Sequence, residues 1–231
     1  MVSLLYSAVG HGGASGYLAL MSLWSFPVLV MKPTALILNL FVSAIAFVAY
    51  ARKGHFRSKL LLAFAITSVP MAFLGGGMHI DASLYRKILG VLLIFAVLRM
   101  MGLLGGKTHS STSVHWLIAL LLGAGIGFFS GLIGIGGGVI LTPLILLLGW
   151  GDMKEAAAVS AAFIWVNSAA ALIGFSGTGV HLGNGIYLMA VLALVGGLLG
   201  AYLGSVKWDQ TRLKYVLALV LVIASAKLIF T

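Results

Sequence analysis

The sequence predicts an all-α integral membrane protein made of two homologous repeats, and three observations carry this prediction. Apolar residues make up 61% of the chain and charged residues only 8%, whereas a soluble domain has about 25% charged residues. Apolar stretches long enough to cross a bilayer recur along the sequence. A glycine-rich, helix-breaking segment also occurs once in each half, at residues 10–16 and 131–138.

The spans follow from the length of the apolar stretches. A helix needs about 20 apolar residues to cross a bilayer core about 30 Å thick. We therefore expect spanning helices at residues 33–51, 59–77, 84–104, 155–175, 185–205 and 211–230. The glycine-containing stretches, 2–31 and 115–150, add one hydrophobic unit to each half. Together these predict one membrane domain with repeat 1 at residues 1–105 and repeat 2 at residues 106–231.

The duplication is visible when the halves are aligned. A shift of 128 positions places Asn39 on Asn167, and the same shift places Asp81 on Asp209. The glycine segments align with a shift of 124, which places Gly10 on Gly134. Asn and Asp are rare letters in so apolar a chain, so these coincidences indicate an internal repeat.

The basic residues distinguish two topologies. With four crossings in each half the halves are parallel, and the 14 Lys and Arg residues divide seven against seven. If each glycine segment instead enters and leaves on one face, each half has three crossings plus a re-entrant helix pair, and the halves are inverted. One side then holds Arg52, Lys53, Arg57, Lys59, Arg99, Lys107, Lys154, Lys207, Arg212 and Lys214, against Lys32, Arg86, Lys87 and Lys227. Ten against four obeys the positive-inside rule, so we favour the inverted arrangement.

The glycine segments predict a binding site. A helix that begins just after a glycine turn presents unpaired backbone N–H groups and a positive dipole end, which attract anions. Two such helices are expected near the midplane, and in an inverted pair they point toward one another. We therefore expect a small anion to be bound by His11, Gly12, Gly13, Ala14, Ser15, Gly136, Gly137 and Gly138. Tight helix packing alone would also explain these glycines.

Two asparagines extend the candidate site. Asn39 and Asn167 lie mid-helix in equivalent spans, where an unpaired amide would cost several kcal/mol, so each should face the bundle interior. Each amide could donate to a ligand or to a neighbouring helix, and the residues alone leave both roles open. His11 has Ile135 as its counterpart, and it could bind ligand, relay a proton or pack.

Composition excludes other kinds of site. Without cysteine there are no disulfides, thiolate metal sites or cysteine nucleophiles. The net charge of +10 comes from basic residues in the connections, so we expect no nucleic-acid partner. No acidic residue lies deep inside a span, which leaves a coupling ion, proton or sodium, unassigned. We expect no catalytic residue, no metal site and no cofactor.

Glycines also repeat every four residues outside the candidate site. Such rows let membrane helices approach closely, and they would also allow a homodimer. The two rows are Gly123, Gly127 and Gly131, and Gly196, Gly200 and Gly204.

The glycine segments also carry a family resemblance. They read Gly10-His11-Gly12-Gly13-Ala14-Ser15-Gly16-Tyr17-Leu18-Ala19 and Gly131-Leu132-Ile133-Gly134-Ile135-Gly136-Gly137-Gly138, the second followed by Pro143. Together with the asparagines behind them, they resemble the sulfite exporter TauE/SafE family of membrane permeases, over essentially the whole chain. The resemblance implies transport of sulfur-containing anions such as sulfite or organosulfonates across a bacterial or archaeal inner membrane.

Three alternatives remain beside an anion transporter. A cation channel or metal permease would want rings of carbonyls or carboxylates, and the carboxylates are absent. A purely structural membrane subunit would not explain two matched helix breaks. An intramembrane serine protease is suggested because Gly13-Ala14-Ser15-Gly16 looks like the nucleophile motif of rhomboid proteases. That mechanism needs a histidine on a neighbouring membrane helix, and none lies mid-span.

Overall fold

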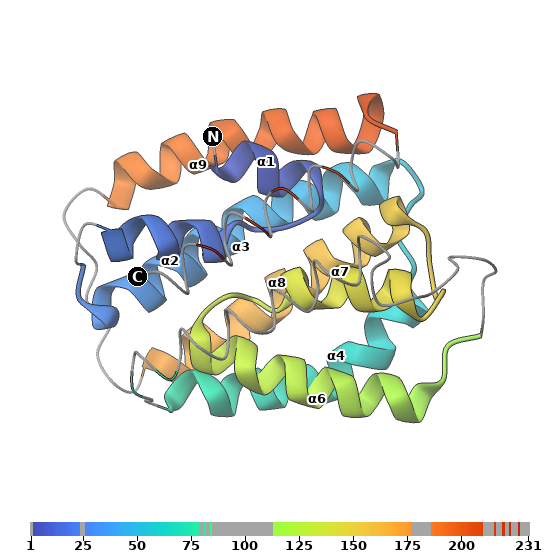
Figure 1. Cartoon of the computed structure of the whole chain (residues 1–231), viewed down its shortest axis with the longest axis horizontal. Helices are drawn as coiled ribbons and strands as arrows, with labels where there is room; N and C mark the ends of the chain where they lie inside the picture. Colours follow the sequence, from blue (N-terminus) through green and yellow to red (C-terminus); the bar gives the residue numbers. More distant parts are fainter. Residues whose placement is uncertain are drawn as a thin grey trace.

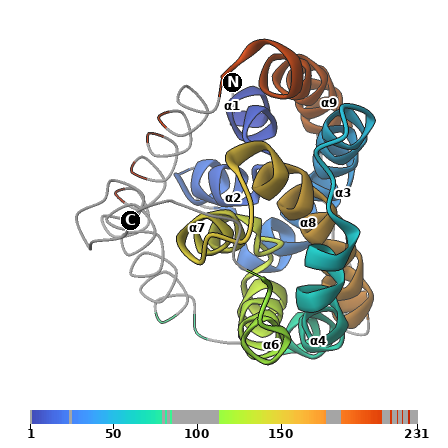
Figure 2. The ribbon, with the colours of Figure 1, turned by 90° about the vertical axis from the view of Figure 1, so that its right-hand side faces the viewer.

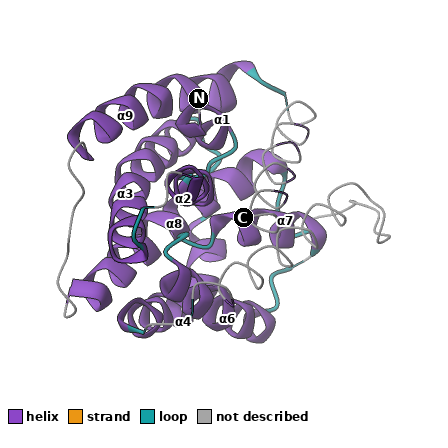
Figure 3. Cartoon of the chain, turned by 60° about the vertical axis from the view of Figure 1, so that its left-hand side comes forward, coloured by secondary structure: helices purple, strands orange, loops and turns teal. Residues whose placement is uncertain are grey.

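A computed structural model describes residues 2–23, 26–78, 113–176 and 186–209, with single positions at 81, 84, 215, 219, 222 and 226. Every regular element within these residues is a helix (Figure 3). Apart from those single positions, the expected spans at 84–104 and 211–230 lie outside the described residues.

The described helices are those of a multi-pass membrane protein. Five are long and apolar enough to span: α3 (Val28–Arg52), α4 (Ser58–Gly77), α6 (Trp116–Ile133), α8 (Met153–Ser176) and α9 (Ile186–Tyr202), which continues as the π-helix η1 (Leu203–Lys207). These positions confirm helices at four expected spans, 33–51, 59–77, 155–175 and 185–205. Large apolar side chains such as Leu121, Ile173 and Leu188 are exposed on the outward faces, which suits a hydrocarbon environment.

The glycine-containing stretches give three short helices and one long one. The first contains α1 (Val2–Ala8) and α2 (Ala14–Leu23), two half-length helices as expected. In the second, α7 (Gly138–Leu147) is short, but α6 has 18 residues and is about 27 Å long. Among the described residues, two half-length helices are therefore present only in the first half. The glycines of α6 are part of one continuous helix and do not interrupt it.

Helices α3 and α8 pack side by side and run antiparallel, with α8 in the middle of the bundle and α3 at its outer side (Figures 1 and 2). Near the middle of α3, Asn39 lies 3.4 Å from Ser168 of α8. Near its end, Tyr50 shares a buried cluster with Ala157 and Ala158, which belong to the start of α8. Because α8 is the most buried of the five candidate spans, this antiparallel pair forms the frame around which the shorter helices pack.

Helices α6 and α4 lie side by side (Figures 1 and 2), and the glycine row of α6 makes their contact. A Cβ atom at Gly127 would strike the backbone carbonyl of Ser68, and one at Gly131 would strike that of Ala72. Both helices thus advance in the same direction, with their backbones in contact. The expected packing role of this row is confirmed.

The glycine row of α9 packs against α1 in the same way. A Cβ atom at Gly196 would strike the Ser3 hydroxyl, and one at Gly204 would strike the carbonyl of Ala8, so α9 and α1 are also parallel. The Ser7 hydroxyl donates to the carbonyl of Gly197 across the same contact, at 2.8 Å. Both glycine rows are covered within the chain, so they do not supply a face for a second copy.

One end of the bundle gathers the basic residues. Arg57 donates to the carbonyl of Trp150 at 2.7 Å and lies 3.4 Å from the Glu155 carboxylate, which brings the α3–α4 and α7–α8 connections together. Asp152 and Glu155 accept each other's backbone N–H groups and cap α8. At this end, called the basic end below, α3 and η1 finish and α4 and α8 begin; it holds Arg52, Lys53, Arg57, Lys59, Lys154 and Lys207.

The α4–α6 contact predicts a position-specific cost for a single methyl group. Gly127→Ala should destabilise the detergent-purified protein by about 1–3 kcal/mol, since the added Cβ must displace backbone. Thermal unfolding measures this. The matched control is Gly125→Ala on the same helix, where a Cβ meets nothing within 4 Å, and it should leave the midpoint unchanged or raise it. Equal midpoints for the two variants would contradict the packing described.

Candidate functional site

Two helix breaks lie inside the bundle: the first break, residues 9–13 between α1 and α2, and the second break, residues 134–137 between α6 and α7. The helix before each one ends at a left-handed glycine, Gly10 with φ 76° or Gly134 with φ 84°. In both, the next residue donates its N–H to the carbonyl five positions earlier. This is a common way to end a helix, and the two copies stand at aligned positions.

The helices that follow also begin alike. Gly13, with φ 94°, precedes α2, and Gly137, with φ 77°, precedes α7. Side chains rarely adopt these φ values, so glycine is required at both starts. No acceptor among the described residues pairs with the backbone N–H groups of the remaining break glycines, Gly12, Gly13, Gly136 and Gly137. Each break therefore offers free donors at a helix N-terminus.

Asn39 joins the two breaks. Its side chain is fully buried, and its Oδ1 accepts the N–H of Ala14, at 3.0 Å, where α2 begins. Its Nδ2 donates to the carbonyl of Ile135 in the second break, at 3.2 Å, and reaches the Ser168 hydroxyl at 3.4 Å. A Cβ at Gly12 would collide with this amide, which explains the glycine there. Of the two roles left open for Asn39, the structure shows the interhelical one.

His11 forms the second link between the breaks. Its ring is fully buried, with Nδ1 2.9 Å from the carbonyl oxygen of Val9 and Nε2 2.9 Å from that of Gly138. The Thr142 hydroxyl lies 3.4 Å from Nε2 and donates to Ser160 at 2.7 Å. A neutral imidazole donates from one nitrogen only, so in each tautomer one of the two carbonyls accepts a hydrogen bond from the ring.

Asn167 behaves differently from its aligned partner. Its Nδ2 donates within its own helix to the carbonyl of Phe163, at 2.8 Å. Its Oδ1 is buried and has no hydrogen-bond partner among the described residues. The alignment of Asn167 with Asn39 therefore does not extend to their hydrogen bonds, and Asn167 does not join the breaks.

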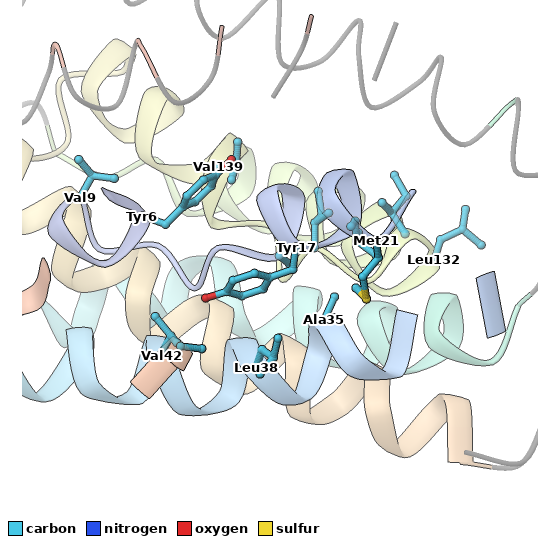
Figure 4. Close-up of a cluster of buried hydrophobic side chains, with 14 of the residues drawn as sticks. Tyr6, Val9, Tyr17, Met21, Ala35, Leu38, Val42, Leu132 and Val139 are labelled. Carbon is cyan, nitrogen blue, oxygen red and sulfur yellow. The ribbon is translucent and has the colours of Figure 1, made fainter. Parts of the chain in front are cut away.

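The remaining expected residues lie in the same buried region. The Ser15 hydroxyl is 2.7 Å from that of Tyr6, which ties α2 to α1. Figure 4 shows the apolar cluster around the breaks, with Tyr6 beside Val139 and Tyr17 over Leu38 of α3. Both breaks are buried throughout, so the structure describes a site closed to water from either end.

One residue of this region was missed at the sequence level. Lys32 was assigned to the connections as a topology signal, yet its side chain is only 7% exposed and packs beside Gly134 of the second break. The available signal was spacing, because Lys32 lies seven residues, or two helical turns, before Asn39 on the same face of α3.

The link through Asn39 predicts that the two asparagines differ in their contribution to stability. Asn39→Ala leaves the N–H of Ala14 and the carbonyl of Ile135 buried without their partner, at about 1–3 kcal/mol each. Asn167→Ala removes one bond within a helix and should cost much less. Thermal unfolding of the two purified variants compares their stabilities. An equal loss of stability in both would contradict a stabilising link between the two breaks through Asn39.

Comparison with known proteins places the chain among membrane transporters. The family model "Sulfite exporter TauE/SafE" matches residues 1–228. A Sinorhizobium fredii protein described as a "probable membrane transporter protein" is 36% identical over 236 residues, covering 100% of this chain and 95% of its own. Proteins with the same description from a Sinorhizobium species and from Methanocaldococcus jannaschii are 28% and 26% identical, covering 86% and 70% of this chain and 76% and 62% of their own.

No solved structure matches the chain significantly. The family and these relatives are transporters and not enzymes, which sets the protease alternative aside. A membrane-embedded bundle with two matched helix breaks, a full-length family match and a relative of nearly the same length lead to one conclusion: the chain belongs to the sulfite exporter TauE/SafE family of membrane transporters.

Proposed function

We propose that this transporter carries a small sulfur-containing anion, such as sulfite or an organosulfonate, and binds it between the starts of α2 and α7. The observation that carries the proposal is that two helix N-termini meet inside the membrane. His11, three residues before α2, lies 2.9 Å from the carbonyl oxygen of Gly138, the first residue of α7. The family description, which names sulfite, supports the substrate class.

The directions of the two helices favour an anion over a cation. From its start, α7 runs to the basic end, where Ile145 packs in a cluster with Leu60 and Trp150. The other helix, α2, runs the opposite way along α3, so that Met21 joins a cluster with Ala35. The positive dipole ends of both helices therefore face the same point, and the free N–H groups of Gly12, Gly13, Gly136 and Gly137 lie just before these helix starts.

A cation site has less support. No group of three or more His, Cys, Asp or Glu residues in the described part of the chain could hold a metal ion. The backbone groups left without a partner at these helix starts are N–H groups of the break glycines, which repel cations.

We further infer that residues 1–105 and 106–231 are inverted repeats. The shared geometry of the two breaks supports this, and so does the antiparallel pairing of α3 with α8, the helices that carry the aligned asparagines. The Arg57–Glu155 contact supports it further, because a parallel arrangement would separate these connections by the thickness of the membrane. The parallel packing of α4 on α6 has its counterpart in that of α9 on α1.

Transport through a closed, buried site requires alternating exposure. We propose that one repeat rocks against the other and opens the breaks first to one side and then to the other. By the positive-inside rule, the basic end faces the cytoplasm of a bacterial or archaeal inner membrane.

Two glycines with the same φ test the site. Gly137→Ala places a Cβ against Phe163 and Ile126 at the start of α7, and should reduce sulfite flux into proteoliposomes by tenfold or more. Gly54→Ala is the control, since Gly54 also has φ 77° but its Cβ would meet nothing within 4 Å. It carries the same backbone strain and should transport normally. If folded Gly137→Ala protein transports sulfite at the wild-type rate, the second break is not part of the substrate site.

A further inference from the structure

Lys32 places a positive charge inside the bundle, away from the basic end. It is the fifth residue of α3 and lies about 30 Å along that helix from Arg52. Lysines near the end of a membrane helix usually extend their ammonium groups toward water. Lys32 does not, because its side chain is 7% exposed and turns into the protein.

The described residues compensate this charge only in part. The ammonium donates to the carbonyl of Gly76, at 2.8 Å, where α4 ends, and lies 5.2 Å from the centre of the Phe175 ring. These are a partial negative charge and a cation–π contact, both weaker than a carboxylate. No carboxylate among the described residues lies within ion-pair distance of Lys32, and the Glu155 carboxylate pairs with Arg57 at the basic end. An ammonium has three donors, and one carbonyl uses only one of them.

The position of Lys32 connects it to the second break. A Cβ at Gly134 would lie 2.9 Å from the Lys32 side chain, so the left-handed glycine that ends α6 also makes room for the lysine. Lys32 and Asn39 occupy the same face of α3 two turns apart, and Asn39 bonds Ile135 in that break. One face of α3 thus places both the Lys32 ammonium and the Asn39 amide beside the second break.

We propose that Lys32 is an anion subsite, which receives the transported oxyanion at the end of the second break away from the basic end. The anion supplies a counter-charge to the ammonium and then moves to the N–H groups at the start of α7. This inference rests on the proposed function. It adds a fixed charge to a site otherwise made of backbone donors, and it would favour anions over neutral sulfur compounds.

Variants of Lys32 separate this role from simple capping of α4. Lys32→Gln keeps a donor for the Gly76 carbonyl but loses the charge, whereas Lys32→Arg keeps the charge. Sulfite flux into proteoliposomes is measured against sulfite concentration for both variants and for the control Lys53→Gln, at the exposed end of α3. We expect Lys32→Gln to raise the half-saturating concentration at least tenfold, Lys32→Arg to stay within threefold of wild type, and Lys53→Gln to match it.

The outcomes distinguish this inference from the proposed function. If wild-type protein transports sulfite and Lys32→Gln keeps its half-saturating concentration, Lys32 only caps α4 and the inference is wrong. If wild-type protein transports no sulfur oxyanion at all, both the proposed function and this inference are wrong. Lys32→Met, of similar volume, provides a second uncharged variant should Lys32→Gln not fold, and a wild-type half-saturating concentration in it would also overturn the inference.

Discussion

The hydrogen bonds of one buried amide fix how the two breaks lie relative to each other. Asn39 accepts the N–H of Ala14, where α2 begins, and donates to the carbonyl of Ile135 in the second break, so segments from the two halves of the chain share one side chain. In hydrocarbon neither backbone group could turn to water instead. Unwound backbone is tolerated here because Asn39 and His11 satisfy part of it from across the bundle. What remains unsatisfied is a set of glycine N–H groups, and these define the candidate site.

A site made of backbone donors suits a transporter of small anions. Fixed charges bind tightly but are costly to leave buried when the ligand departs, whereas dipoles at helix N-termini attract an anion at lower cost. Gly13, Gly136 and Gly137 adopt positive φ values, and together with Gly12 they place no side chain over the backbone N–H groups. Lys32 is the exception, a buried charge placed at the edge of the second break beside Gly134.

Much of this architecture could be predicted from the sequence, because hydropathy and glycine spacing report directly on spans and breaks. The packing of Gly127 and Gly131 on α4 follows from a repeat visible in one dimension. The differing roles of Asn39 and Asn167 could not be predicted, since they depend on which carbonyl each amide reaches. The burial of Lys32 could not be predicted either, because a basic residue next to a proline and an apolar run is typical of the membrane interface.

The most direct test of the account is ligand-induced stabilisation of the purified protein. Thermal unfolding would be followed with sulfite, sulfate, thiosulfate, sulfoacetate, taurine and phosphate, and with sodium, potassium, magnesium and zinc as chlorides. A ligand at 100 times its dissociation constant stabilises the native state by about 2.7 kcal/mol, which is readily measured. The account predicts stabilisation by at least one sulfur oxyanion, reduced in Gly137→Ala. Stabilisation by cations alone would contradict it and identify a cation pathway instead.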